Sequence, residues 1–146
     1  IGFPGETWEE IRDSTNFAEE LDADAVKFAI ATPFPGTELF EKAVAGGYLP
    51  KDFNFYRDDA LGFAHGVINT EEFTVKELEM LRCFEWDRIN FKTQDKKERY
   101  AKMNLMTLEE LEEFRKQTRK NVGVFFMDQV AEEREESDKT FIQAKT

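Results

Sequence analysis

Two proline-glycine turns in matching positions constrain the fold of this chain more than any other feature. Each is followed by a threonine that can start a helix, and the interval between them holds one helix-sized amphipathic segment and one strand-sized alternating segment. Each turn therefore stands where we expect a strand to end and a helix to begin. That order is typical of consecutive βα units in a parallel sheet, whose functional residues lie in the loops after the strands. The turns read Gly2-Phe3-Pro4-Gly5-Glu6-Thr7 and Thr32-Pro33-Phe34-Pro35-Gly36-Thr37.

Short local patterns predict where the helices begin. Thr7-Trp8-Glu9-Glu10 is a capping box, in which the threonine hydroxyl accepts a hydrogen bond from the third backbone N–H and the glutamate reaches back. The same pattern recurs at 74–77 and 107–110, and Thr37 is a simpler cap. The expected helices run from Thr7 to about Leu21, from Thr37 to Gly46, from Val75 to about Phe91, and from Leu108 past Val122, while part of the charged connector 92–102 is compatible with a helix.

Alternating residues predict strands in two places. At 25–31 bulky residues face one side and small ones the other, with Lys27 as the exception, which suits a strand covered on both faces. At 60–70 the alternation is interrupted by Gly62 and Gly66, and interior glycines weaken a strand. The prediction is therefore an α/β fold with two or three short strands.

Charge and composition exclude several classes of function. The formal net charge of −11 argues against a nucleic-acid surface or attraction to anionic lipid. No apolar run approaches the roughly 20 residues of a membrane span. A single cysteine, Cys83, excludes an internal disulfide or a multi-cysteine metal site and fits a reducing cytoplasm. Because Ile1 leads straight into a turn and nothing resembles a signal peptide, we expect an excised portion of a longer polypeptide.

Most other reactive residue types have a structural interpretation. The single histidine, His65, has no nucleophile or ligand set near it in sequence and is expected to be structural or exposed. Cys83 lies on an apolar helix pattern and is expected to be a buried, inert thiol. The pair Asp58-Asp59 is interpreted as a loop. The glutamates of 109–113 are interpreted as a solvated helix face.

Each turn has two interpretations. Pro4 and Gly5 reverse the chain tightly, which is a purely structural role. Alternatively, a glycine lets a ligand approach the backbone, the helix that follows offers free N–H groups, and Glu6 accepts a bond from a ligand. The second turn is a stiff connector, or a rigid apolar loop on which Phe34 stacks against a flat ring. Because the turn occurs twice, we favour a shared role on one rim.

The two turns and the segments between them resemble a known family. Residues 1–7, the amphipathic helix and residues 28–37 are similar to the later barrel strands of radical S-adenosylmethionine (SAM) enzymes. The resemblance is closest to the class with an N-terminal cobalamin-binding domain, which includes the anaerobic magnesium-protoporphyrin ester cyclases. Residues 84–91 resemble the helical region after the barrel in some of those proteins. The barrel resemblance covers about the first third of the chain.

The resemblance implies a specific fold and domain organisation. The expected fold is an α/β fragment, the last βα units of a partial radical-SAM (TIM-like) barrel, followed by a mainly helical C-terminal region. Residues 1–70 would be the C-terminal part of the barrel, residues 71–131 a helical tail region, and residues 132–146 an acidic, disordered end.

The resemblance also implies which residues contact the cofactor. The first turn corresponds to a strand end that lines the SAM pocket, and the second to one that contacts the adenine. No catalytic residue and no metal ligand is expected in this chain. The 4Fe-4S cluster of the family needs a cysteine triplet that is absent here, so the cluster, and cobalamin if used, would be bound by other parts of the parent protein. The expected SAM-contacting residues are Gly2, Pro4, Gly5, Glu6, Thr32, Pro33, Phe34 and Gly36.

Two functions follow as alternatives. The first is the C-terminal portion of a radical-SAM Fe-S oxidoreductase, cyclase-like or methyltransferase-like, that is inactive alone, pairs with the rest of its own polypeptide and acts on a small molecule. Its exposed strand edges would be covered by helices or would cause self-association. The second is a non-catalytic α/β-helical module that binds a partner protein through its Phe-rich helices. In the first, a large planar substrate would lie near Tyr48, Phe53, Phe55 and Tyr56.

Overall fold

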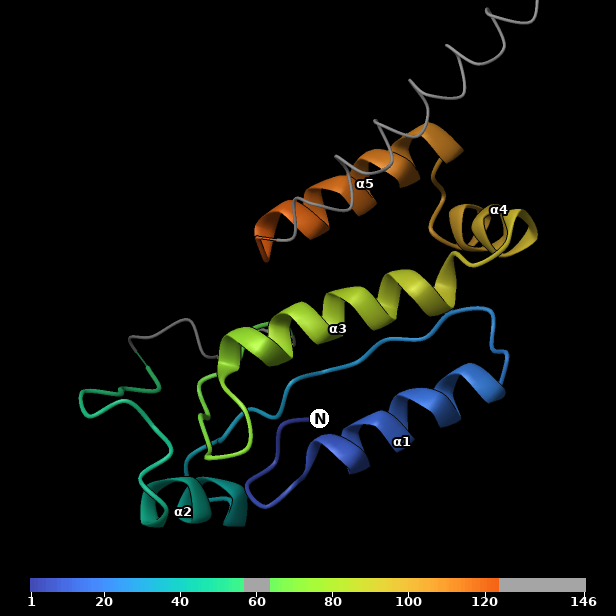
Figure 1. Ribbon diagram of the computed structural model, residues 1–146. Coiled ribbons are helices and arrows are strands. Elements are labelled where there is room, and N and C mark those ends of the chain that lie inside the picture. Colours follow the sequence, from blue (N-terminus) through green and yellow to red (C-terminus); the bar gives the residue numbers. More distant parts are fainter. Residues whose placement is uncertain (57–63, 124–146) are drawn as a thin grey trace, which may run out of the picture.

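The computed structural model describes residues 1–56 and 64–123 of the chain. All four helices expected from local patterns are present in these residues, and a fifth occupies most of the connector 92–102. The helices, labelled in Figure 1, are α1 (Trp8–Glu20), α2 (Glu38–Ala45), α3 (Val75–Asn90), α4 (Gln94–Met103) and α5 (Leu108–Asn121).

The predicted helix caps are confirmed. At α1, α3 and α5 the threonine hydroxyl accepts from the third backbone N–H of the helix, and the glutamate at that position bonds back to the threonine backbone. The Thr37 hydroxyl accepts from the Phe40 N–H at 3.2 Å and so starts α2. These bonds occupy N–H groups that have no partner inside the helix.

Residues 25–31 are extended and run between α1 and α3 (Figure 1). At one end the Ile1 nitrogen donates to the Ala29 carbonyl at 2.9 Å, and the Ala31 N–H donates to the Ile1 carbonyl at 2.8 Å. At the other end the side-chain amide of Asn90 accepts from the Val26 N–H at 2.7 Å and donates to the Val26 carbonyl at 2.9 Å. One residue and one side chain therefore take the place of neighbouring strands.

The prediction of an α/β fragment, with two or three strands as the last units of a partial radical-SAM barrel, is wrong. The described residues contain five helices and no regular strand. A strand needs a ladder of backbone partners, and the extended segment 25–31 finds only the bonds described above. Of the second expected strand, residues 64–70 form none, and residues 60–63 lie outside the described part.

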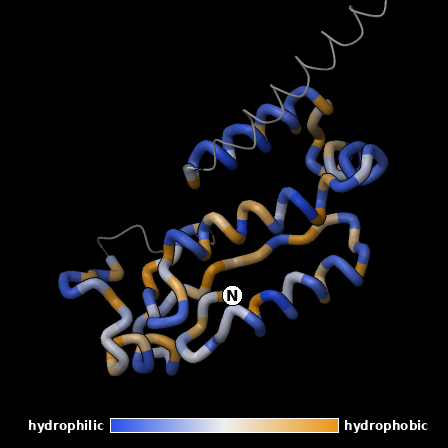
Figure 2. The backbone as a smooth tube through the Cα atoms, viewed as in Figure 1, coloured by the Kyte–Doolittle hydropathy of each residue, from blue (hydrophilic) through white to orange (hydrophobic). Residues whose placement is uncertain are grey.

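One apolar cluster joins α1, the extended segment and α3. Ile11, Ile30, Phe73 and Leu78 are all at most 3% exposed and pack together, with Trp8 against them. Figure 2 shows the hydrophobic stretch of the extended segment between the two helices. Burial follows the alternation at 25–31 only in part, since Ile30 is buried and Lys27 is exposed, but Ala31, on the side of Lys27, is buried as well.

A second, aromatic cluster joins α3, α4 and α5. The rings of Trp86 and Phe91 meet edge to face with centroids 5.0 Å apart, and those of Phe91 and Tyr100 with centroids 4.9 Å apart. Leu111 of α5 is fully buried against them, with Met106 packed beside it. Edge-to-face contacts add to the free energy gained from burying the rings, so this cluster fixes the three helices together.

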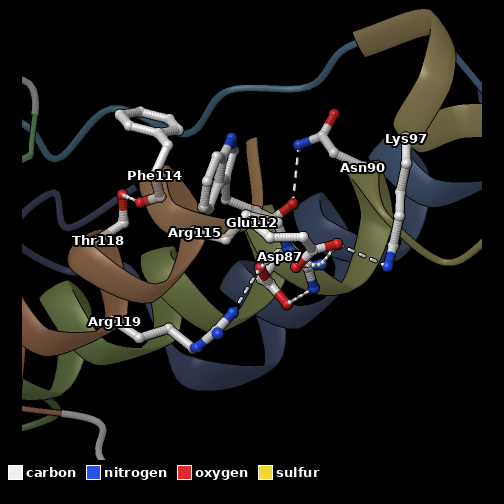
Figure 3. A network of polar contacts seen from close by, with 9 residues as sticks. Asp87, Asn90, Lys97, Glu112, Phe114, Arg115, Thr118 and Arg119 are labelled. Carbon is white, nitrogen blue, oxygen red and sulfur yellow. Dashed lines mark hydrogen bonds and ion pairs between the residues drawn. The ribbon is translucent and has the colours of Figure 1, made fainter. Parts of the chain in front are cut away.

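A buried polar network ties α5 to α3 (Figure 3). Arg115 donates to both carboxylate oxygens of Asp87 at 2.8 Å, and Arg119 donates to one of them at 3.2 Å. The Arg115 guanidinium also lies over the Phe91 ring, 4.6 Å from its centroid. Glu112 bonds Arg115 and Lys97, which brings α4 into the network.

The proposed division into residues 1–70 and 71–131 stays a prediction. α3 packs against α1 on one side and against α4 and α5 on the other. The predicted acidic end, 132–146, and the pair Asp58-Asp59 lie outside the described residues. None of the helices in residues 1–56 and 64–123 has the length and apolar character that crossing a membrane requires.

Candidate functional site

Both proline-glycine turns close with the same hydrogen bond. The Glu6 N–H donates to the Phe3 carbonyl at 3.0 Å, and the Thr37 N–H donates to the Phe34 carbonyl at 3.1 Å. In each turn the glycine after proline has positive φ, +90° at Gly5 and +84° at Gly36. Proline followed by a glycine at positive φ is the arrangement of a type II turn, which other residues adopt only with strain.

The two turns begin at adjacent points of the backbone. Ile1, which precedes the first turn, is hydrogen-bonded to Ala29 and Ala31, which precede the second. A Cβ added at Gly2 would lie 3.5 Å from the Ile30 side chain and 3.9 Å from the Ala31 nitrogen, so Gly2 also lies close to these residues. The eight residues predicted to contact SAM therefore belong to two neighbouring turns that leave from one pair of hydrogen-bonded segments.

Four of these eight residues hold the turns in place. Gly2 is buried, and a Cβ there would lie 2.8 Å from the Leu78 side chain. The Glu6 carboxylate accepts from the backbone N–H groups of Gly2 and Phe3, so it fastens its own turn. Pro33 is buried, and the Thr32 hydroxyl lies 3.5 Å from the Ile30 carbonyl.

The remaining turn residues leave room for a ligand. A Cβ on Gly5 or Gly36 would meet nothing within 4 Å, so the backbone there is open on that side. Pro4 is half-buried. Phe34 is 48% exposed, and its ring lies 5.2 Å, centroid to centroid, from that of Phe55. The part of the two turns that is open to a ligand is therefore formed by Gly5, Gly36 and the exposed ring of Phe34.

The backbone at the start of α1 is less free than the sequence suggested. The Trp8 N–H donates to the Glu72 carboxylate at 3.1 Å, and the Trp8 indole donates to the Glu72 carbonyl at 2.8 Å. The Thr7 hydroxyl accepts a hydrogen bond from the Glu10 N–H. A ligand at the first turn would compete with Glu72 for the helix start.

The four aromatic residues predicted near a substrate do not all gather in one place. Phe55 contacts both Phe34 and Tyr56, with Tyr56 edge to face at 5.6 Å and 90% exposed. Tyr48 instead lies over Gly46 at the end of α2. Phe53 is half-buried and makes no ring contact with the other described aromatic side chains. Only Phe55 and Tyr56 extend the second turn.

A separate pocket of about 460 Å³ lies between the extended segment, α3, α4 and α5. Phe28, Trp86, Tyr100 and Phe114 supply aromatic walls. None of the eight turn residues lines it. Its volume is within the range of small-molecule sites.

Arg82 of α3 lines this pocket, and its Nε is buried without a hydrogen-bond partner among the described residues. Burial lowers the pKa of this guanidinium, opposed by the nearby Cys83 and by Glu79. The Glu79 carboxylate is itself bonded to His65 Nδ1 at 3.1 Å. The pocket is therefore lined by a partly buried cation with one buried N–H, at Nε, that has no partner among the described residues.

The predicted burial of Cys83 and the predicted exposure of His65 are confirmed. Cys83 is 1% exposed, and burial raises the pKa of its thiol, with Asp87 adding to the rise. His65 is exposed and pairs with Glu79. In residues 1–56 and 64–123, no group of three His, Cys, Asp or Glu side chains is arranged to hold a metal ion.

The comparisons with known proteins give one partial similarity. Over 49 residues, 34% of this chain, it is 53% identical to a protein of Pyrococcus horikoshii named as an uncharacterized methyltransferase, and the match spans 11% of that relative. No protein-family model matches the chain. No solved structure matches it. Part of the chain is thus similar to a protein named as a methyltransferase, while no radical-SAM or cyclase family is shown.

Sequence reasoning found the rim of the two turns and missed the pocket. The turns carry a local pattern of proline and positive-φ glycine that can be read from neighbouring residues. The pocket walls come from Phe28, Arg82 and Phe114, which are far apart in the chain. Nothing in the sequence around Arg82 marks it as unpaired, because the pairing of an arginine is decided by tertiary packing.

Proposed function

We propose that this chain supplies part of the SAM-binding surface of a methyltransferase-type enzyme of the radical-SAM class. The observation that carries the proposal is that the two proline-glycine turns stand side by side, with open backbone at Gly5 and Gly36 and an exposed ring at Phe34. The partial similarity to a protein named as a methyltransferase supports the same cofactor.

The residues present fit an adenine better than any other part of SAM. An adenine is flat and apolar on its faces, and it stacks on aromatic side chains with about 1–3 kcal/mol per base. Phe34 offers such a face, with Phe55 beside it. Glycine at position 36 lets the backbone amides approach the ring edge without a side chain between them.

A 4Fe-4S cluster does not fit this chain. Cluster ligation needs several thiolates, and the single cysteine is buried within α3. In our proposal the cluster, and cobalamin if the enzyme uses it, are bound by other segments of the same polypeptide in a reducing cytoplasm. That remainder of the polypeptide is the proposed partner, and the substrate is a small molecule.

The test is SAM binding by the full-length gene product, prepared anaerobically with iron and sulfide. Phe34→Ala is expected to raise the dissociation constant for SAM about tenfold, as loss of one stacking contact predicts. Phe17→Ala is the matched control, because Phe17 is also an exposed phenylalanine, 61% against 48% for Phe34, but lies on α1. Equal SAM affinity in wild type and Phe34→Ala, or no SAM binding at all, would refute the proposal.

Cleavage of SAM gives a second, independent measurement. The full-length protein is expected to release 5′-deoxyadenosine under reducing conditions, whereas the 146-residue chain treated in the same way is expected to release none. Turnover by the short chain would contradict our assignment of the cluster to other segments.

The exposed apolar side chains favour a second candidate, a protein-interaction module. Leu105 is 94% exposed at the turn between α4 and α5, and Met103 beside it is 57% exposed. Such side chains are often covered by a partner or by a second copy of the chain. Sedimentation of the chain at several concentrations tests this: a monomer throughout argues against self-association, and Leu105→Ser should abolish any dimer that forms.

A further inference from the structure

The pocket between the extended segment, α3, α4 and α5 has a charge opposite to that of the chain. The sequence contains 31 acidic residues against 20 basic ones. Yet the described residues that line the pocket include Lys27, His65 and Arg82 and no aspartate or glutamate. In a chain of net charge −11, a lining whose described charged side chains are basic is suited to an anionic ligand, although Glu79 lies behind it, bonded to His65.

Arg82 gives the pocket a specific polar group. Its Nε is buried without a hydrogen-bond partner among the described residues, although the nearby Glu79 carboxylate favours the positive charge. Buried polar groups in native proteins are nearly always hydrogen-bonded, because an unpaired one loses water without replacement. An arginine offers its donors in a planar fork that matches a carboxylate.

The other side chains that line the pocket favour a flat, apolar ligand. Trp86 and Phe114 face each other edge to face with centroids 5.7 Å apart, and Phe28 and Tyr100 add further ring surface. Asn104, which also lines the pocket, already donates to the Tyr100 carbonyl at 2.8 Å. A ligand in the pocket would therefore contact mostly aromatic rings, and the Arg82 guanidinium would contact one end of it.

We propose that this pocket binds a flat, largely apolar molecule that carries one carboxylate, with the carboxylate on Arg82 and the body against the rings of Phe28, Trp86 and Phe114. A cationic ligand would meet Lys27 and Arg82 as like charges, and an uncharged one would leave the Arg82 guanidinium unpaired. The site is separate from the proposed SAM rim, and its occupation does not require SAM.

The experiment compares two probes of the same shape on the 146-residue chain by titration calorimetry. 2-Naphthoate carries the carboxylate, and 2-naphthalenemethanol carries a neutral hydroxyl in its place. The wild type is expected to bind 2-naphthoate at least tenfold more tightly than the alcohol, since a hydrogen bond to a charged group accounts for a factor of that size. Equal binding of the two probes, or no binding of 2-naphthoate, overturns the proposal.

Variants separate the charge from the shape of the pocket. Arg82→Met keeps the aliphatic stem, and it should remove the preference for 2-naphthoate while leaving the alcohol unaffected. Arg12→Met, on the exposed side of α1, is the matched control and should change neither affinity. Phe114→Ala should weaken both probes several-fold. Unchanged 2-naphthoate affinity in Arg82→Met overturns the proposal.

Thermal unfolding distinguishes a ligand-binding arginine from a structural one. Because the buried Nε of Arg82 has no hydrogen-bond partner in the described residues, Arg82→Met should unfold at the same or a higher temperature than the wild type in the absence of probe. Adding 2-naphthoate should raise the unfolding temperature of the wild type more than that of Arg82→Met. A lower unfolding temperature for Arg82→Met would mean that the guanidinium is paired within the protein, which overturns the assignment.

Discussion

Two partly buried guanidinium groups, Arg115 of α5 and Arg82 of α3, differ in how their charges are paired. Toward α5, burial disfavours the charge on Arg115, but its bonds with Asp87 and Glu112 outweigh burial and raise the pKa of Arg115. Toward the pocket, burial is not offset in this way and lowers the pKa of Arg82. The difference distinguishes the Asp87 network, where buried polar groups are satisfied within the chain, from the pocket at Arg82, which is available to a ligand.

The same contrast exists within the rim of the two turns. Gly2 and Glu6 are held by contacts with Leu78 and with backbone N–H groups. Gly5, Gly36 and Phe34 have open space or exposed surface around them. The stability of the fold is therefore expected to depend on Gly2 and Glu6. Ligand binding is expected to depend on Gly5, Gly36 and Phe34.

The largest effect on stability is expected from Asp87→Ala, which removes the carboxylate at the centre of the network with Arg115 and Arg119. The substitution leaves Arg115 buried without its carboxylate, and breaking a buried pair in this way costs about 3–5 kcal/mol of unfolding free energy. Chemical unfolding followed by circular dichroism measures the loss. Asp24→Ala is the control, because its pair with Arg99 is exposed and such pairs contribute about 1 kcal/mol or less. Similar losses in the two variants would show that the Asp87 network is not a closed core.

Asn90→Ala is expected to have the next largest effect, about 2–3 kcal/mol. It removes the bonds to both backbone groups of Val26 and to the Trp86 carbonyl. Hydrogen exchange should speed up at the Val26 amide in particular, which a general loss of stability would not single out. Asn16→Ala, on the exposed side of α1, should leave the Val26 amide protected. Unchanged exchange at Val26 in Asn90→Ala would contradict the bonding described above.

The helix starts could be predicted because their information is local. The pairs Thr7–Glu10, Thr74–Glu77 and Thr107–Glu110 lie three residues apart, and each box forms as the sequence indicates. The positive φ of Gly5 and Gly36 likewise follows from the preceding proline and the tight turn.

The strand and the pocket could not be predicted in the same way. Alternation at 25–31 describes two sides of a segment, but only tertiary structure decides whether its N–H groups meet another strand or the Asn90 side chain. The sequence also gives no sign that Asp87 pairs with Arg115, 28 residues later, while Arg82 stays unpaired. What failed were the inferences that required knowing a distant partner.

Gly2→Ala and Gly5→Ala compare the closed and open parts of the first turn. Both place a side chain at positive φ, +92° and +90°, which costs about 1–2 kcal/mol. At Gly2 the new Cβ would also lie 2.8 Å from Leu78, whereas at Gly5 it would meet nothing within 4 Å. We expect Gly2→Ala to lose about 1 kcal/mol more than Gly5→Ala, measured by urea unfolding. Equal losses would mean that Leu78 moves aside freely.

The smallest effect concerns the cap of α3 and depends on pH. The backbone bond from Thr74, followed by the Thr74 hydroxyl, lowers the pKa of Glu77 below its usual 4.5. A carboxylate with a lowered pKa in the folded state stabilises the fold above about pH 4.5, and this contribution is lost as the pH falls through the lower folded value. Glu77→Gln should therefore unfold at a lower temperature than the wild type at pH 7.

The difference between Glu77→Gln and the wild type should then shrink as the pH falls below about 4.5, since the wild-type carboxylate is protonated as the pH passes through its lowered folded pKa. Glu113→Gln, on the exposed surface of α5 and without a capping bond, is the control and should follow the wild-type curve at every pH. If the gap between Glu77→Gln and the wild type stays constant with pH, the charge of Glu77 plays no part in the cap, and the helix start depends on the Thr74 hydroxyl alone.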